Sequence, residues 1–573
     1  MAEVQIPRGG DEGLQVWATR VVQLPKGVVE RVYAMIHQLL GRVSRHKVDE
    51  YVPRTEGSPT HSNSSSGVSR VSSTSSALSV GDLPLPIRVS KSGPPSDPLA
   101  QREGKAEWVH GYFFKESPEW LVEPDMSLIK GIMEPHLEKH GFGTKDISVE
   151  FFAGGALNKL YTITSTTTQP DQQHQCILRV TMPVVPWYKT ESEVATTEYI
   201  RRHTNIPVPK IYAYDSSIDN KLGLEWIMME KVKGQPLLHY WDVHTHQVDR
   251  FDMATKLQIA RTVAEWVHQL SKLTFDKIGS LYIDWDTPKP TFKLGRVVDV
   301  DFFRGRRLAY KVFRGPFRDI EQYYHSVIEL QLQEIHDPVQ RTRLEARLLR
   351  IEQAKKAEEE KARLEKEAVA NNPEGEADKD AAQVGKKESS RIDWDHVDDE
   401  DDWYREQDFT GIPKACHALL SVLPVILLRD PPAKEPNTLY HFDISVRNVL
   451  LDDCGKLVGL VDWEIINTSP YENLRAYPGL LDNDGYNITT LEPWDGGEKD
   501  KTRLSNELYQ VQTLLGKEFR KYLEDKASPW LRAFAEPSPE RSQLMTRVHE
   551  IPWYQRTMED WAQHIEAGEE YDE

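Results

Sequence analysis

The chain has 573 residues, of which 39% are hydrophobic and 28% are charged, and 71 Lys and Arg stand against 90 Asp and Glu, giving a formal net charge of −19 at pH 7. Such an acidic chain lacks the cationic face that nucleic-acid phosphates require, so no nucleic-acid partner is expected. Three cysteines are too few for a disulfide scaffold or a four-cysteine zinc site, and they fit a reducing compartment.

Residues 1–53 form an N-terminal extension in which apolar positions recur at roughly helical spacing among basic residues. The pattern predicts an amphipathic helix, which either packs on its own domain or binds a surface. Acidic residues near the start (Glu3, Asp11 and Glu12) disfavour a mitochondrial leader, and no secretory signal is expected. No stretch approaches the ~18 apolar residues of a membrane span. We therefore expect a cytoplasmic protein without a transmembrane segment.

Three further segments differ in composition from the rest of the chain. Residues 54–106 are rich in Ser and Pro and are predicted to be a disordered linker, because they offer too little apolar surface to offset chain entropy. Residues 350–404 form a charged insertion, which starts in a Glu- and Lys-rich helix and ends in an acidic run. Residues 566–573 form an acidic tail. We interpret the insertion as a solvated projection and, like the N-terminal tail, as a candidate site for protein partners; an acidic lip that steers a cationic substrate is the alternative.

The stretch from Tyr440 to Glu464 carries the strongest local signal. Apolar runs at 449–451 and 457–461 flank a Gly-containing turn, which predicts a β-hairpin. Pairing centred between Cys454 and Gly455 places Asn448 opposite Val461. The hairpin would therefore present Asn448 and the next residue, Asp462, at the same end.

Asp443 lies five residues before Asn448, in the loop that leads to the same end of the hairpin. Two carboxylates and one amide oxygen at this density suit Mg²⁺, which prefers hard oxygen ligands. The alternative, that these residues only shape turns, fits Asp452 and Asp453 better, because they lie inside the turn itself.

The segments HFDISVRN, from His441 to Asn448, and VGLVDWE resemble the catalytic loop and metal-binding segment of the aminoglycoside phosphotransferase and choline kinase family, which has a protein-kinase-like fold. The resemblance implies that Asp443 is the catalytic base and that His441 buttresses the loop. It implies that Asn448 and Asp462 hold the magnesium ions that bridge the nucleotide phosphates.

A Gly-Gly turn between two strand-like runs resembles the phosphate loop of this family through Gly154, Gly155 and Asn158. Backbone N–H groups in such a turn meet phosphate oxygens. Two glycines alone are a weak signal, because any hairpin uses them.

A single charge, Arg179, lies within the apolar run 175–180, where it requires a partner. We predict Glu193 as that partner, with Glu191 and Glu198 as alternatives. Most kinases have Lys at the position of Arg179, and the two side chains differ in geometry, so this departure favours altered nucleotide binding or a pseudoenzyme.

Residues 224–234 resemble the segment that joins the two lobes in this family and reads the edge of adenine. Met229 and Glu230 are the predicted adenine-site residues. An ordinary edge strand is the alternative.

These resemblances imply an α+β, two-lobed protein-kinase-like fold, with a small β-rich N-lobe at 107–234 and a larger helical C-lobe at 235–565 that contains the catalytic loop at 440–464. The implied activity is ATP- and Mg²⁺-dependent transfer of the γ-phosphoryl group to a hydroxyl of a small molecule. A pseudokinase or scaffold is the alternative. A protein kinase is disfavoured because Phe442 replaces the arginine of those enzymes.

The acceptor is not specified by the sequence. Trp463, Glu464 and Tyr471 either line its pocket, where they would suit a cationic amine, or belong to the core. The resemblance is strongest to a fungal branch of large phosphotransferase-like proteins, part of which is associated with mitochondrial inheritance. A mitochondrial location is therefore the alternative to a cytoplasmic one.

Overall fold

The computed structural model describes residues 84–110, 116–167, 172–241, 248–342, 411–432, 436–474, 477–481, 503–535 and 537–569, and residues 353, 356, 363 and 571. The helix predicted within 1–53 and most of the predicted linker lie outside the described residues. So does the charged insertion, apart from residues 353, 356 and 363, which are helical and exposed. The predicted acidic tail begins inside the last helix, Met558–Ala567.

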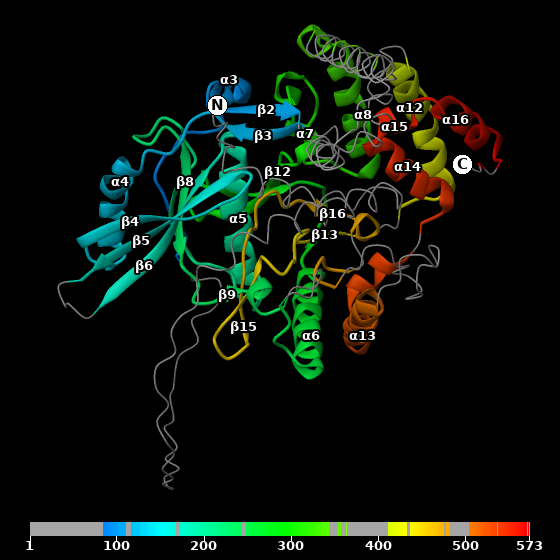
Figure 1. The fold of residues 1–573 in the computed structure, drawn as a ribbon. Coiled ribbons are helices and arrows are strands. Elements are labelled where there is room, and N and C mark those ends of the chain that lie inside the picture. The colour runs from blue at the N-terminus through cyan, green and yellow to red at the C-terminus, as the bar shows by residue number, and fades with distance from the viewer. Residues whose placement is uncertain are drawn as a thin grey trace, which may run out of the picture.

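The N-lobe contains one six-stranded sheet (Figure 1). Its strands are β1 (Ile87–Arg88), β4 (Lys145–Gly154), β5 (Asn158–Thr166), β6 (Gln173–Thr181), β7 (Ile211–Asp215) and β8 (Glu225–Glu230). They lie in the order β1-β7-β8-β6-β5-β4, with β1 parallel to β7 and the other neighbours antiparallel.

Two helices cover the two faces of this sheet. Helix α4 (Met126–Lys139) packs Met133 against Leu178 and Met228 on the outer face. Helix α5 (Tyr188–His203) packs on the face toward the C-lobe. Arg179 pairs across the sheet with Leu160 and Ile227, so these three residues share the face covered by α5, because paired residues on neighbouring strands point to the same side.

The prediction that residues 54–106 are a disordered linker is wrong for 84–106. This segment contains β1, helix α3 (Pro98–Arg102) and the start of β2 (Ala106–His110), which forms a hairpin with β3 (Glu116–Trp120). Asp97 caps α3 by accepting a hydrogen bond from Ala100 N–H at 3.0 Å. Arg88 forms an ion pair of 2.8 Å with the buried Glu191 of α5. Tertiary contacts therefore order a segment whose composition alone predicts disorder.

The chain leaves the N-lobe sheet at Glu230 and enters the C-lobe through β9 (Gln235–Pro236). β9 pairs with β14 (Val449–Leu451), which pairs in turn with β15 (Leu457–Leu460). A Cβ atom on Gly234 would lie 2.7 Å from the carbonyl oxygen of Leu451, so only glycine fits this crossing. The chain therefore passes from one lobe to the other at this point.

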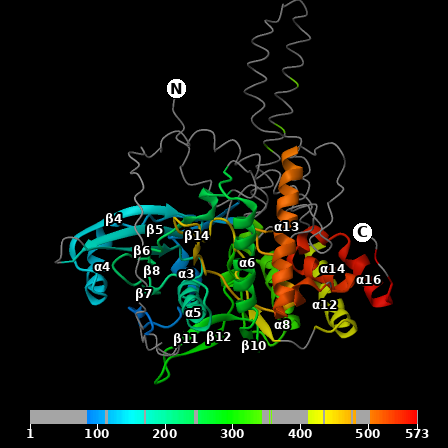
Figure 2. The same cartoon turned by 90° about the horizontal axis from the view of Figure 1, so that it is seen from below.

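The C-lobe is mainly helical and has two hydrophobic clusters (Figure 2). Near the N-lobe, α6 (Met253–Leu270) lies beside α13 (Arg503–Asp525), and Tyr522 donates a hydrogen bond of 2.6 Å to Glu265. Farther away, helices α8, α12, α14 and α16 form the second cluster. The remaining bounds are β10 (Thr274–Phe275), β11 (Ser280–Asp284), β12 (Thr291–Gly295), α7 (Val300–Phe303), α8 (Ile320–His336), α12 (Gly411–Arg429), β13 (Asn437–Leu439), β16 (Thr468–Ser469), α14 (Pro539–His549), α15 (Ile551–Tyr554) and α16 (Met558–Ala567).

Among the described residues, one helix, α12, is long and apolar enough by length and composition to cross a membrane. Its residues Cys416, Leu419 and Val422 are buried in the second cluster of the C-lobe, where it packs against α8 and α16. Its length and composition are therefore explained by a core position. The predicted α+β fold, with a small β-rich N-lobe and a larger helical C-lobe, is confirmed.

Candidate functional site

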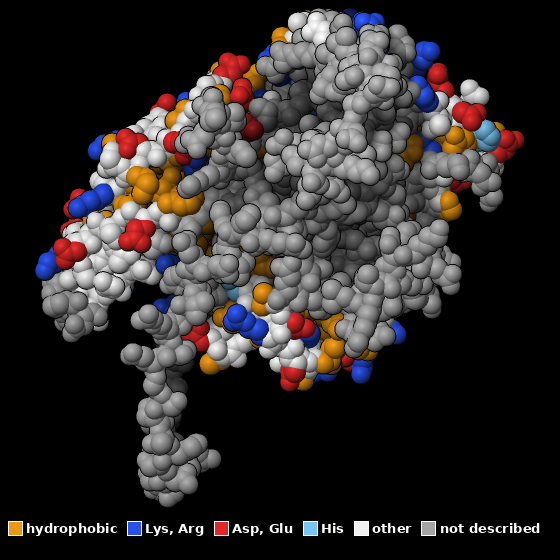
Figure 3. Space-filling model, in the orientation of Figure 1, with side chains coloured by type: hydrophobic (Ala, Val, Ile, Leu, Met, Phe, Trp, Pro, Cys, Tyr) orange, Lys and Arg blue, Asp and Glu red, His pale blue; other side chains and the backbone are white. Residues whose placement is uncertain are grey.

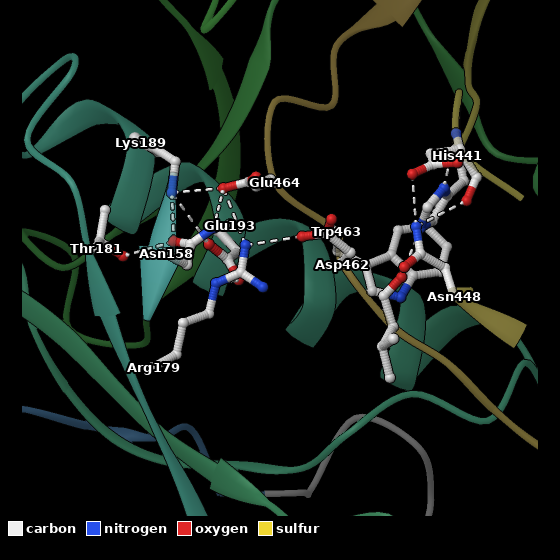
Figure 4. Close-up of polar contacts among 12 residues, drawn as sticks. Asn158, Arg179, Thr181, Lys189, Glu193, His441, Asn448, Asp462, Trp463 and Glu464 are labelled. Atoms are coloured by element: carbon white, nitrogen blue, oxygen red, sulfur yellow. Dashed lines mark hydrogen bonds and ion pairs between the residues drawn. The ribbon is translucent and has the colours of Figure 1, made fainter. Parts of the chain in front are cut away.

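The residues predicted for the site lie where the two lobes meet (Figure 4). Arg179 comes from β6 and Glu193 from α5. His441, Asp443 and Asn448 come from the loop that precedes β14, while residues 461–464 follow β15. In Figure 4, Asp462 lies between a cluster of charged groups around Arg179 and the His441 and Asn448 side chains.

The loop before β14 is held by a buried histidine. His441 is fully buried, its Nε2 lies 2.9 Å from the carbonyl oxygen of Val461, and its Nδ1 accepts the N–H of Asp443 at 3.2 Å. Burial lowers the pKa of His441, so the ring is neutral and carries its proton on Nε2. The ring also meets Trp463 edge-on at 4.7 Å. These contacts tie the loop before β14 to the segment that follows β15.

One carboxylate oxygen of Asp443 accepts a hydrogen bond and the other does not. Asn448 Nδ2 donates to Asp443 Oδ2 at 2.7 Å and to its carbonyl oxygen at 3.1 Å. Asp443 Oδ1 is buried and has no hydrogen-bond partner. Burial raises the pKa of Asp443 and the nearby carboxylate of Asp462 raises it further, whereas the neighbouring Ser445 hydroxyl and Asn448 amide lower it. The unpaired oxygen is therefore a stronger base than an exposed aspartate.

The hairpin has the predicted register at its open end. Val449 pairs with Leu460, and Val461 N–H donates to the carbonyl of Asn448 at 3.0 Å, so Asn448 lies opposite Val461. A bulge shifts the register only near the turn, at Leu451. Asp462 then adopts a left-handed backbone conformation with φ of 71°. Asp tolerates this conformation better than most residues, and such strain is concentrated at functional sites.

Arg179 joins the two lobes through three carboxylates. It lies 3.1 Å from Glu193, 2.7 Å from Asp462 and 2.9 Å from Glu464. The predicted pairing of Arg179 with Glu193 is therefore present. The alternative partners are engaged elsewhere, Glu191 with Arg88 and Glu198 with two arginines of its own helix.

Lys189 is a second cation in the cluster, and it was not predicted from the sequence. Its side chain is 1% exposed, and its Nζ lies 2.5 Å from Glu464 and 4.0 Å from Glu193. It also donates to Asn158 Oδ1 at 3.0 Å. The only signal in the sequence is its position four residues before Glu193, which places both on one face of α5.

Three carboxylates thus share two cations. Burial alone would raise the pKa of Glu464, but Lys189 and Arg179 lower it to about 2. Burial raises the pKa of Glu193 to about 7, because Arg179 and Lys189 are shared with the other carboxylates and do not compensate fully. The cluster therefore takes up one proton, on Glu193, near neutral pH.

The glycine turn contributes one side chain to this cluster. Gly155 N–H donates to the carbonyl of Asn158 at 2.8 Å and closes the turn between β4 and β5. Asn158 is buried, and its Nδ2 donates to Glu464 at 2.9 Å. A Cβ atom on Gly155 would meet only the Asn158 carbonyl, at 3.9 Å, so the fold itself has room for a side chain there. Just before the turn, Phe151 and Phe152 are 57% and 54% exposed, and a hydrophobic patch is visible on the N-lobe in Figure 3.

The two predicted adenine-site residues occupy different faces of the sheet. Met229 pairs with Ile177 and lies on the face of Arg179, toward the C-lobe. Glu230 pairs with Cys176 on the opposite face, and its N–H donates to the carbonyl of Lys210 at 2.8 Å. Its carboxylate accepts from Lys210 N–H at 3.2 Å. The geometry therefore suits Met229 for contact with a bound base and leaves Glu230 engaged within the N-lobe.

The residues after Asp462 do not line an acceptor pocket. Trp463 is 2% exposed and donates to the carbonyl of Leu460 at 2.9 Å. Tyr471 is 4% exposed within the core. Glu464 is committed to Lys189 and Arg179. Of the two interpretations offered from the sequence, the core position applies to both aromatic residues.

Asp462 and Asn448 offer oxygen donors of the kind that magnesium prefers. Asn448 directs its amide nitrogen to Asp443 and so leaves its oxygen for a cation, and the side chain of Asp462 is 25% exposed. Within the described ranges, no group of three His, Cys, Asp or Glu side chains is arranged to hold a metal ion. A metal in this site would thus need oxygen ligands beyond carboxylates.

The chain is similar to a known protein family and to several fungal proteins. A family model described as a phosphotransferase enzyme family matches residues 148–470. A subtelomeric hrmA-associated cluster protein of Aspergillus fumigatus is 30% identical over 176 residues, which cover 29% of this chain and 32% of that protein. Altered inheritance of mitochondria protein 9, mitochondrial, of Debaryomyces hansenii is 26% identical over 170 residues, or 29% of this chain and 24% of that protein. These matches span about a third or less of the length of either relative.

A crystal structure of a thermostable mutant of an aminoglycoside phosphotransferase, in its apo form, matches with 13% sequence identity and a TM-score of 0.30. The match covers 76% of this chain and 99% of that one.

Proposed function

Because the chain belongs to the phosphotransferase enzyme family, we propose that it transfers the γ-phosphoryl group of ATP, with Mg²⁺, to a hydroxyl group of a small molecule. The observation that carries this proposal is the buried, unpaired Oδ1 of Asp443, in a loop fixed by His441 and Asn448. A buried carboxylate oxygen without a partner is costly, and its retention is expected where it contacts a substrate.

Asp443 would act as the general base. Its Oδ2 is held by Asn448, so Oδ1 remains to accept the proton of an acceptor hydroxyl. The raised pKa of Asp443, caused first by burial, brings this carboxylate closer to the pKa of a base that works near neutral pH. His441 fixes the direction of the carboxylate through the backbone of the same residue.

Asn448 and Asp462 would hold magnesium, which supplies charge neutralisation for the phosphates when bound. Arg179, braced by Glu193, would face the α- and β-phosphates from the N-lobe. The turn at Gly155 supports this placement. The fold leaves room for a side chain at this position, so packing does not require a glycine there. Close approach of a ligand to the backbone would explain the glycine. Met229 would contact the base.

Nucleotide binding is tested by thermal unfolding with ATP, with Mg²⁺ and with both. Ligand at a hundredfold excess over its Kd stabilises the folded state by about 2.7 kcal/mol. We expect stabilisation only when both are present, and its loss in Asp462→Asn. The matched control is Asp453→Asn, in the exposed hairpin turn, which should respond like the natural protein. Failure of Mg²⁺ and ATP together to stabilise the natural protein would contradict the proposal and favour the scaffold alternative.

The location of the protein is a separate proposal. The relative from Debaryomyces hansenii is named as mitochondrial, which favours the mitochondrial alternative over the cytoplasmic one. Fractionation of cells that express the full chain tests this; recovery outside mitochondria would contradict it.

A further inference from the structure

Two arginines lie together on the C-lobe, outside the cluster around Arg179. Arg296 directly follows β12, and Arg314 directly precedes Gly315. Val297, the neighbour of Arg296, donates its N–H to the carbonyl oxygen of Arg314 at 2.7 Å. The backbone thus fixes the two arginines beside each other.

Neither of these arginines has a carboxylate partner within the described residues. Nearby Arg306 and Arg307 are paired with Asp337 at 3.0 Å and with Glu334 at 2.6 Å, whereas no ion pair involves Arg296 or Arg314. The Nε atoms of both are buried and make no hydrogen bond. The fold therefore provides acids for the neighbouring arginines and leaves this pair uncompensated.

The two guanidinium groups are held by an aromatic ring and by carbonyl groups. Arg296 lies 4.5 Å from the ring centroid of Tyr188. Arg314 donates to the carbonyl of Val312 at 3.3 Å and to that of Arg307. Burial lowers the pKa of Arg296, and burial together with the charge of Arg296 lowers the pKa of Arg314 to about 10. Each group therefore loses solvation without gaining a counter-ion, which is unfavourable in the free protein.

We propose that Arg296 and Arg314, with Tyr188, form a binding site for an oxyanion, the phosphate or carboxylate group of a small molecule. Paired guanidinium groups present planar sets of N–H donors that match the oxygens of such anions, and a bound anion would supply the missing charge. Both side chains are only partly buried overall, so a small anion reaches them.

The site lies next to the interlobe cluster but is distinct from it. Tyr188 precedes Lys189, which binds Glu464. Tyr188 also packs with Tyr282 and Ile465 in one hydrophobic cluster at the boundary of the lobes. Anion binding by the two arginines does not depend on phosphoryl transfer at the interlobe cluster.

The test uses inorganic phosphate as the probe. Unfolding of the full chain is followed in Hepes with sodium chloride and in sodium phosphate of equal ionic strength, with a sodium acetate arm to separate phosphate from carboxylate. We expect phosphate or acetate to raise the midpoint temperature of thermal unfolding of the natural protein. Titration calorimetry should show affinity at least about tenfold weaker in Arg296→Gln and Arg314→Gln. Arg318→Gln is the matched control, since Arg318 is 76% exposed and lies four residues from Arg314.

A structural role for these arginines predicts a different pattern. Arg314→Lys keeps the charge and should retain part of the anion response, while Arg314→Gln should be no less stable than the natural protein in the chloride buffer. No midpoint shift in the natural protein, or an equal shift in all variants, would overturn the proposal. So would a loss of stability in both glutamine variants with the phosphate response intact.

Discussion

Replacement of Lys189 by Met should destabilise the protein through Glu464. Lys189 Nζ lies 2.5 Å from Glu464, and the two side chains are 1% and 8% exposed. Their attraction, with that of Arg179, lowers the pKa of Glu464 from 4.5 to about 2 against the effect of burial. One pKa unit corresponds to about 1.4 kcal/mol, so the favourable surroundings of this carboxylate contribute about 3 kcal/mol. Loss of one partner from a buried pair costs about 3–5 kcal/mol by comparison.

A double-mutant cycle measures this interaction. Urea unfolding at pH 7 gives the free energy of unfolding for Lys189→Met, for Glu464→Gln and for the double variant. We expect each single variant to lose about 3 kcal/mol, and the double variant to lose much less than the sum, because no charge is left unpaired. Lys521→Met, a lysine on α13 outside the cluster, is the control. Additive losses, or a loss below about 1 kcal/mol for Lys189→Met, would refute the reasoning.

Three further results are expected. Asp443→Asn should lower kcat by at least about a hundredfold while the KM for ATP stays nearly constant. A rise in the KM for ATP as large as the fall in kcat would argue against a general base. Because burial raises the pKa of Glu193 to about 7 from 4.5, the folded state binds an additional proton and its stability falls as the pH rises through this window. A Glu193→Gln variant should lack that decline in urea titrations between pH 4.5 and pH 7, and an unchanged pH profile would contradict the assignment. Arg88→Gln should lower stability by about 1–3 kcal/mol, because it leaves the buried Glu191 without its cation; the control is the exposed Lys91→Gln, and equal midpoints for both would refute this.

The Glu464 carboxylate gives a second pH range in which stability changes, and in this range stability falls as the pH falls. Because its pKa is lowered in the folded state, its contribution is fully present above pH 4.5 and is lost as the pH falls toward 2. The pH ranges of Glu193 and Glu464 do not overlap. The combined contribution of these two carboxylates to stability should therefore be largest near pH 4.5. Glu464→Gln should remove the stability change in the lower pH range and should also lower the pKa of Glu193, because one carboxylate fewer then shares Arg179 and Lys189.

The parts of the site that were predictable have strong local signals. The register of the hairpin follows from two apolar runs and one turn, and Arg179 required a partner because it is a lone charge in an apolar strand. Lys189 was not predictable in the same way, since a lysine in the first turn of a polar helix is usually solvated, and only the approach of Glu464 from the other lobe buries it. Similarly, β1 is a strand of two residues with no periodicity, and its pairing with β7 depends on tertiary structure alone. Contacts between distant segments therefore account for most of what the sequence did not reveal.

The position of β1 bears on how the protein avoids self-association. Without it, β7 would be the last strand of the N-lobe sheet, and its free N–H and C=O groups would be available to another chain. β1 covers that edge, with Val89 N–H bonded to the carbonyl of Tyr214 at 2.9 Å, and the Arg88–Glu191 ion pair fixes it in place. The matched family region begins at residue 148, so the segment that protects this edge lies outside it. A chain that lacks residues 84–90 should consequently aggregate through β7 even if its catalytic loop folds correctly.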